Sequence, residues 1–169
     1  LHSNIHHNQM DELDKWTEHA KEVLDFWPIA YYPFQMIKTE SGAGLEDLCP
    51  EEEIKKDWEI VRGKVKEENA NGYPMFMGYE WQGFDGDHNV FFLDNEQDMK
   101  HPMRYQELRD DYKDTEAIGI PHHVAYQLGS RGKNWATHDE KFSPFAEIYS
   151  SHGCSENDTG GMDMERHLH

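Results

Sequence analysis

The feature that most constrains the fold of this chain is an alternation of short apolar segments with amphipathic ones. The apolar segments are rich in aromatic and β-branched residues, and each has the length of a single strand. We expect strands at 26–34, 73–81, 88–93, 117–121 and 145–150. Apolar residues at helical spacing predict helices at 11–25, 50–68 and 102–112. The alternation favours an α/β fold, built as a layer or a barrel around a parallel sheet.

Polar side chains stand in or near the last positions of four of these expected strands. They are Tyr31-Tyr32, Glu80, His122-His123 and His152. In parallel α/β folds the carboxyl ends of the strands meet at one edge, and active residues collect there. The sequence therefore predicts one functional site at this edge.

The first eight residues add further metal-binding side chains. His2, His6 and His7 lie there together with Asn4 and Asn8. Neutral imidazole is the commonest biological metal ligand and binds zinc, manganese and iron. We expect His2 and His7 to contribute to a metal centre. A frayed, His-rich terminus or the remnant of a tag is the alternative reading of this stretch taken alone.

Each downstream candidate has a chemical reason and a plainer alternative. Glu80 ends an apolar run, where a carboxylate is costly to bury unless it is paired or bound to a metal, and its alternative is a strand end in solvent. His88 follows a Gly-Asp-Gly-Asp turn, and Gly153 lets a tight turn aim His152. His122 and His123 are adjacent, so on an extended chain their side chains point to opposite sides and only one binds the metal. Three carboxylates are candidates for direct or supporting roles, although a solvated position is expected for each: Asp85, Asp87 and Glu147.

Composition limits the class of protein. The 169 residues carry a formal charge of -18, which disfavours nucleic acid and anionic membranes as partners. An aromatic content of 12% argues for a folded chain, which we expect to be a single domain over residues 1–169. No apolar run reaches the roughly 20 residues that cross a bilayer, so we expect a soluble protein. Because the chain opens without Met, secretion or a periplasmic location after loss of a leader stays open.

Several other kinds of site are disfavoured by missing motifs. Cys49 and Cys154 form no Cys-x-x-Cys pair, although a disulfide between them stays open. The chain has no Gly-x-Ser-x-Gly elbow, no phosphate-cradling Gly-x-x-x-x-Gly-Lys-Ser/Thr loop and no dinucleotide fingerprint. Hydrolysis assisted by a metal ion is the chemistry that remains.

The order of several short motifs resembles the PHP (polymerase and histidinol phosphatase) superfamily of metal-dependent phosphoesterases, and in particular a PHP-like subgroup of uncharacterised function. The matching pieces are Leu1-His2, Gly78-Tyr79-Glu80-Trp81, His88-Asn89-Val90, Ile120-Pro121-His122-His123 and Glu147-Ile148-Tyr149-Ser150-Ser151-His152-Gly153. The resemblance implies a distorted (β/α)7 TIM-like barrel with two or three divalent ions (Zn, Mn or Fe) at its mouth. It also implies that a metal-bound hydroxide attacks a phosphorylated small molecule.

The resemblance carries over to individual residues. His2 matches the first ligand of the opening motif, Glu80 the bridging carboxylate and His122 the later strand-end histidine, whereas His88 and His152 match more loosely. Glu80 and His122 are therefore the expected catalytic residues. The expected metal ligands are His2, His7, Glu80, His88, His122 and His152, and the expected substrate-binding residues are Asn4, Tyr32 and His123.

The chain also departs from the family pattern. Asn4 replaces the second histidine of the opening pair, with His6 or His7 as substitutes, and Tyr31-Tyr32 replaces an Asp-His pair. The closing Asp-x-His has no match. Two readings follow: a chain that lacks the last part of a longer catalytic domain, or a PHP-like module that has lost catalysis and serves in binding or structure. The oligomeric state, the substrate and the metal do not follow from the sequence.

Overall fold

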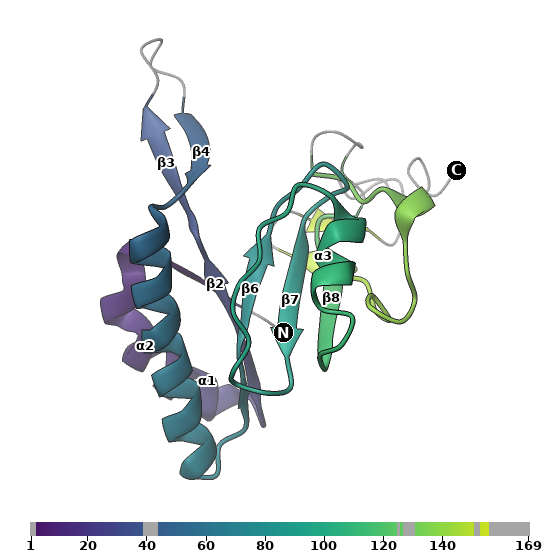
Figure 1. Cartoon of the computed structure of the whole chain (residues 1–169). Helices are drawn as coiled ribbons and strands as arrows, with labels where there is room; N and C mark the ends of the chain where they lie inside the picture. The colour runs from purple at the N-terminus through teal and green to yellow at the C-terminus, as the bar shows by residue number, and fades with distance from the viewer. Residues whose placement is uncertain (1–2, 39–43, 125, 127–130, 151–152, 156–169) are drawn as a thin grey trace. The chain divides into compact units, whose positions relative to one another are not determined.

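The structure is a computed structural model that describes residues 3–38, 44–124, 126, 131–150 and 153–155 (Figure 1). It forms two compact units, one of Leu1–Tyr79 with Leu93–Gln97 and the other of Glu80–Phe92 with Asp98–His169. Both contain strands and helices, so the expected mixed α/β class is confirmed. The single domain over residues 1–169 stays a prediction.

Apart from one hairpin, the paired strands of the first unit are parallel, as expected. β1 (Ser3–His6) pairs with β2 (Trp27–Tyr32) so that His6 lies opposite Tyr32. On its other side β2 pairs with β5 (Met75–Phe76) and, through Tyr31 and Tyr79, with the start of β6 (Gly78–Trp81). The core of these strands is fully buried and includes Ile5, Ile29, Tyr31 and Tyr79.

Two helices accompany these strands. The 3-10 helix η1 (His7–Glu12) leads into α1 (Leu13–Val23), so the α-helix begins two residues later than expected. α2 (Glu51–Ala70) starts one residue after Pro50, with three glutamates in its first turn facing the positive end of the helix dipole. Two ion pairs of 2.6 Å join the helices, Lys64 with Asp14 and Lys21 with Glu68.

An antiparallel hairpin that the sequence pattern did not predict follows β2. It consists of β3 (Phe34–Lys38) and β4 (Gly44–Leu48), with Phe34 opposite Leu48 (Figure 1). Gln35 and Asp47, which lie opposite each other in the hairpin, are exposed. The polar, Gly-containing segment 40–44, which the sequence predicts to be a loop, lies mostly outside the described residues. Beyond the hairpin, Cys49 is a buried free thiol, so no disulfide to it exists in the described part of the chain.

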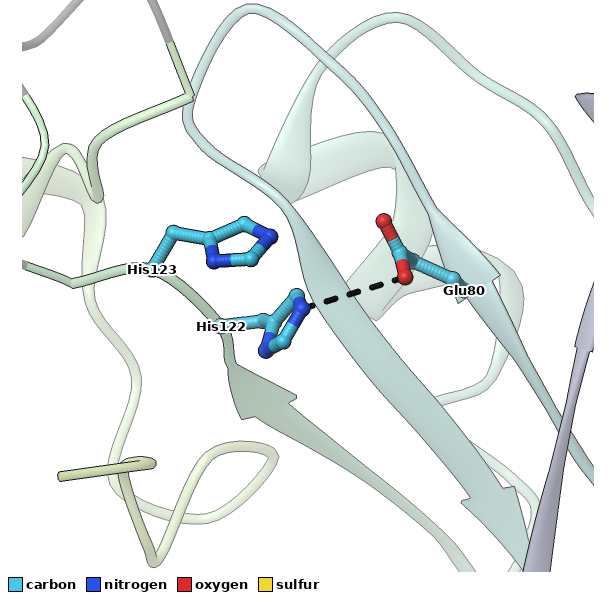
Figure 2. Close-up of side chains that lie close together, drawn as sticks. All are labelled: Glu80, His122 and His123. Carbon is cyan, nitrogen blue, oxygen red and sulfur yellow. Dashed lines mark ion pairs between the residues drawn. The ribbon is translucent and has the colours of Figure 1, made fainter. Parts of the chain in front are cut away.

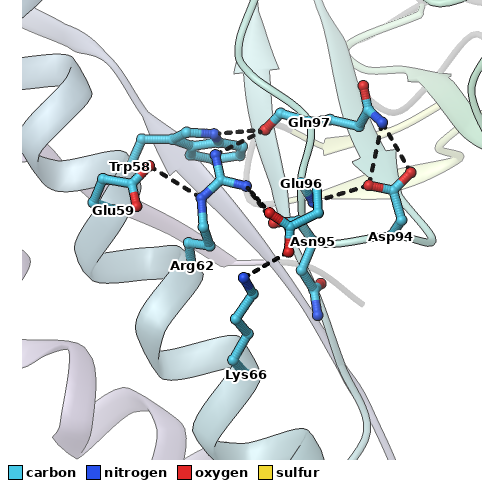
Figure 3. A network of polar contacts seen from close by, with 8 residues as sticks. All are labelled: Trp58, Glu59, Arg62, Lys66, Asp94, Asn95, Glu96 and Gln97. Carbon is cyan, nitrogen blue, oxygen red and sulfur yellow. Dashed lines mark hydrogen bonds and ion pairs between the residues drawn. The ribbon is translucent and has the colours of Figure 1, made fainter.

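A short segment, 93–97, is held against α2 by polar contacts (Figure 3). Nε1 of Trp58 donates to the carbonyl oxygen of Gln97 at 2.9 Å, and Arg62 donates to the carbonyl oxygens of Asn95 and Gln97. Lys66 pairs with Glu96 at 2.6 Å. Buried donors on α2 thus satisfy backbone groups of a segment without regular structure.

The second unit departs from the parallel arrangement that we expected. β7 (His88–Phe92) and β8 (Ala117–Pro121) are antiparallel, with His88 opposite Pro121. The connection between them contains α3 (Tyr105–Asp111), and long helical connections usually join parallel strands. The reversed direction places the first residue of β7 at the edge where β8 ends.

The remaining elements of the second unit are short. They are η2 (Trp135–Thr137), β9 (Tyr149–Ser150) and β10 (Gly153–Cys154). The strand expected at 145–150 forms only at its last two residues, but the amide of Glu147 donates to the carbonyl oxygen of Pro121 at 3.0 Å. No closed barrel is formed by the described strands. None of the described helices is long and apolar enough to cross a membrane.

Candidate metal centre

Glu80 lies on β6 with its side chain inside the protein. The residue is only 1% exposed, so the solvent-exposed strand end considered as an alternative is wrong. Nε2 of Gln82 donates to Oε1 of Glu80 at 3.3 Å. A carboxylate in such a position is costly unless positive charge or several hydrogen bonds compensate it. Burial therefore favours a cation or charged partner beside Glu80.

His122 and His123 follow β8 and are 5% and 2% exposed. The amide of His122 donates to the carbonyl oxygen of Asp87 at 2.9 Å, which fixes the backbone where the strand ends. His123 then adopts a left-handed conformation with φ of 55°. The two ring centroids are 3.5 Å apart. The expectation that the two side chains point to opposite sides is wrong, because the chain turns at His123 instead of remaining extended.

These three side chains form one buried group in the second unit (Figure 2). One donor atom from each of Glu80, His122 and His123 lies within 4.8 Å of the others. Oε2 of Glu80 is 3.9 Å from Nε2 of His122, too far for a hydrogen bond. Two donors that bind one ion through bonds of about 2.0–2.2 Å are separated by roughly 3–4 Å. The separation between Glu80 and His122 and the donor types of all three residues fit a divalent transition metal.

Glu147 contacts the ring nitrogen of His122 that is not directed at Glu80. Its Oε1 lies 2.6 Å from Nδ1 of His122. A proton on Nδ1 leaves the lone pair on Nε2, the nitrogen nearest Glu80. Histidines that bind metals usually donate their second ring N–H to a carboxylate in this way. The solvated position expected for Glu147 is wrong, since its side chain is only 15% exposed.

His88 is fully buried but has other partners than this group. Its Nδ1 lies 2.9 Å from the carbonyl oxygen of Gly86, and its Nε2 lies 3.1 Å from Nζ of Lys133. Burial, reinforced by the charge of Lys133, holds the pKa of His88 well below 6.5. The neutral ring therefore donates through Nδ1 and accepts from Lys133 through Nε2. In this arrangement both ring nitrogens of His88 have protein partners.

Lys133 is a buried amine that sequence reasoning missed. Its Nζ lies 3.4 Å from the centroid of the Tyr105 ring, and the residue is 2% exposed. Gly86, with φ of 96°, allows the close approach, because a Cβ there would lie 2.6 Å from the carbonyl oxygen of Gly132. Burial lowers the pKa of Lys133 from 10.5 to about 7, opposed by the negative charge of Asp85.

Because the pKa of Lys133 is lowered, we expect the free energy of unfolding to depend on pH. We expect Lys133→Met to remove this part of the pH dependence. Between pH about 7 and 10.5 this amine is mostly protonated in the unfolded chain and mostly deprotonated in the folded chain. The free energy of unfolding therefore rises with pH. We expect the wild-type slope in this window to exceed that of the variant by up to about 1.4 kcal/mol per pH unit. Urea denaturation at several pH values measures it. Lys113→Met, at an exposed site, is the control, and equal slopes in wild type and Lys133→Met would contradict the prediction.

Asp85 and Asp87 are buried, so the solvated positions expected for them are wrong. Oδ2 of Asp85 accepts from the amide of Tyr105 at 3.1 Å, and Oδ1 accepts from Nδ2 of Asn134 at 2.8 Å. Oδ2 of Asp87 lies 3.9 Å from Nε of Arg131. Asp85 therefore holds α3 and the loop before η2 together.

The other sequence candidates belong to the first unit or lie outside the described residues. Nδ1 of His7 is 2.6 Å from Oδ2 of Asp57, and its Nε2 is 3.0 Å from Oε2 of Glu53, so both ring nitrogens face carboxylates on α2. Asn4 lies on β1, and Tyr32 ends β2. His2 and His152 lie outside the described residues, and their predicted ligand roles stay predictions.

Tyr31 is a structural residue of the first unit. Its hydroxyl donates to Oδ2 of Asp57 at 2.8 Å, and burial together with this hydrogen bond raises its pKa. The phenol therefore stays protonated.

Comparisons with protein-family models, curated proteins and solved structures give no match to this chain. A proposal for its function therefore rests on the buried group of the second unit and on the sequence motifs around it.

Proposed function

We propose that this chain is a metal-dependent hydrolase whose centre includes Glu80, His122 and His123, and that its substrate is a phosphoester. The observation that carries the proposal is the buried carboxylate beside two imidazoles, with Glu147 bonded to the far nitrogen of His122. Ordinary stability gives no reason to bury this combination, because an apolar core avoids the cost of removing charge from water.

Each side chain of the group would have a different role in binding a metal. Glu80 supplies negative charge to a cation, and His122 presents Nε2 to the same space because Glu147 holds its other nitrogen. His123 offers a second imidazole from the turn after β8. Imidazole and carboxylate together suit zinc, manganese or iron. When bound, such an ion activates water and stabilises the charge that develops on a phosphoryl group.

The phosphoester as substrate, and a PHP-type barrel as the complete fold, are proposed from the resemblance of the motifs. All three residues of the group, Glu80, His122 and His123, stand in these motifs. His2, His88 and His152 would be the further ligands of a centre with two or three ions. For His88 this role requires the bond to Lys133 to be exchanged for a metal.

The test is metal analysis of protein purified without affinity resin, combined with hydrolysis of p-nitrophenyl phosphate and bis(p-nitrophenyl) phosphate. We expect at least one transition metal per chain and hydrolysis that a chelator abolishes and the same metal restores. Hydrolysis that is unaffected by complete removal of the metal would overturn the proposal, as would protein that binds no transition metal.

A module that binds ligands without catalysis is the second candidate. Tyr31 favours it, because its buried hydroxyl is bonded to Asp57 at a position where the family pattern has a metal ligand. Tightly bound metal without hydrolysis of either ester would support this candidate, and chelator-sensitive hydrolysis would exclude it.

Glu147 should affect metal affinity through its contact with His122, without being a metal ligand itself. Replacing it with Ala removes the acceptor for Nδ1 of His122, so the ring loses its fixed tautomer and orientation. Loss of such a supporting carboxylate typically weakens metal affinity by about 10–100-fold, and we expect a decrease in this range. Competition with a chromophoric chelator measures it. Glu140→Ala, at an exposed site, should leave the affinity unchanged, and an unchanged affinity in Glu147→Ala would contradict the assigned role.

A further inference from the structure

The first unit contains a cavity of about 330 Å³ between the end of β1, the end of β2 and the hairpin of β3 and β4. The residues that line it include His6, Tyr32, Phe34 and Glu46. The ring centroids of His6 and Tyr32 are 4.5 Å apart, and those of Tyr32 and Phe34 are 5.4 Å apart. The volume is at the lower end of the range for small-molecule sites.

The charge around this cavity disfavours an anionic ligand. No described residue that lines it is Lys or Arg, and Glu46 contributes a carboxylate directly. His7, also in the wall, lies between the carboxylates of Glu53 and Asp57. A phosphate or carboxylate would meet these carboxylates, and among the described lining residues it would find no lysine or arginine to compensate them.

A metal ion is also a poor match for the cavity. Both ring nitrogens of His7 are occupied by Glu53 and Asp57. The remaining metal-binding side chains of the wall are His6 and Glu46, and Oε1 of Glu46 accepts a hydrogen bond of 2.8 Å from the hydroxyl of Tyr32. Two protein ligands fall short of the three or four that hold a transition metal tightly.

The arrangement suits an organic cation. Aromatic faces attract ammonium groups within about 6 Å of a ring centroid, and Tyr and Phe both act in this way. The hydroxyl of Tyr32 donates to a carboxylate, which increases the electron density of the ring and so its attraction for a cation. Glu46 adds a full negative charge beside the ring. Apolar methyl groups of an alkylammonium would meanwhile contact Phe34 and Met36.

We propose that the cavity bordered by His6, Tyr32, Phe34 and Glu46 is a binding site for the alkylated ammonium group of a small organic cation. The site belongs to the first unit and does not depend on hydrolysis by the second. It uses the neighbouring aromatic side chains of His6, Tyr32 and Phe34 as its wall and Glu46 as the counter-ion.

The test compares two ligands of the same shape and different charge. In 3,3-dimethylbutan-1-ol a carbon atom takes the place of the quaternary nitrogen of choline, so the two ligands have the same shape but only choline is charged. Methyl glucoside is a third ligand, which tests whether the cavity binds a sugar instead. In titrations followed by NMR on the full chain, we expect choline to bind with a dissociation constant on the order of 1 mM. The neutral alcohol and the glucoside should bind at least about fivefold more weakly, because neither has the charge that the rings attract.

Variants locate the site. Glu46→Gln and Tyr32→Leu should each weaken choline binding by about fivefold or more. Glu52→Gln removes a charge from an exposed position of α2 that does not line the cavity and should leave binding unchanged. Thermal melting and amide spectra check that each variant is folded, and if Tyr32→Leu unfolds, the comparison of Glu46→Gln with Glu52→Gln carries the test. The proposal is overturned if the alcohol binds as tightly as choline, if the glucoside binds in its place, or if Glu46→Gln and Glu52→Gln behave alike.

Discussion

Under the proposed function, replacing Glu80 with Gln should remove most of the bound metal and lower phosphoester hydrolysis by about 10³-fold or more, equivalent to about 4 kcal/mol of transition-state stabilisation. The substitution keeps the shape of the side chain and an oxygen that can accept from Gln82. What it removes is the negative charge beside His122 and His123 in a buried site. Because an amide is a weak ligand for zinc, manganese or iron, the change should affect metal and activity together.

Matched measurements separate this loss from general damage. Glu116→Gln changes the same type of residue at an exposed site of the second unit and should keep full metal content and activity. In the presence of chelator the Glu80 variant should melt at least as high as wild type, because it lacks the buried charge that the removed metal would compensate. Full metal content together with wild-type activity in Glu80→Gln would contradict the assignment of this centre.

The sequence predicts this part of the centre for identifiable physical reasons. A carboxylate at the end of an otherwise apolar run stands out, because its burial needs compensation, and Glu80 is indeed buried. β8 is predicted over 117–121 as observed, so the positions of His122 and His123 directly after a strand were also accessible from the pattern. Periodicity likewise identifies α2, whose apolar stripe includes the buried residues Trp58 and Val61.

Other features depend on contacts that sequence patterns do not contain. The direction of β8 relative to β7 is one, because the apolar pattern of a strand is the same in either direction. The left-handed turn at His123 is another, since it is unusual for a residue other than Gly and brings both imidazoles into one group. Lys133 gave no signal at all, because a lysine in a polar stretch is normally exposed. Its place beside His88 arises only when a distant loop folds over the start of β7.

The stability of the first unit should depend most strongly on Trp58, and Trp58→Ala should lower the free energy of unfolding by about 3–5 kcal/mol. The residue is 3% exposed on α2. Its ring centroid lies 6.4 Å from that of Tyr31 and 6.1 Å from that of Tyr79. Truncation therefore leaves a cavity between α2 and the strands and also removes the donor to Gln97. Because whole domains are stable by only about 5–15 kcal/mol, this is a large share.

Two further variants divide this effect into its parts. Trp58→Phe keeps an aromatic ring in the core but loses the N–H that reaches Gln97, so it should cost about 1–3 kcal/mol, less than the alanine variant. Trp135→Ala, in a half-buried position of the second unit, is the control for losing a tryptophan elsewhere. Hydrogen exchange at residues 27–32 and 93–97 reports on the first unit alone and should speed up in Trp58→Ala, with little change in Trp135→Ala. Equal protection of these segments in both variants would show that packing of Trp58 on Tyr31 and Tyr79 does not hold α2 to the strands.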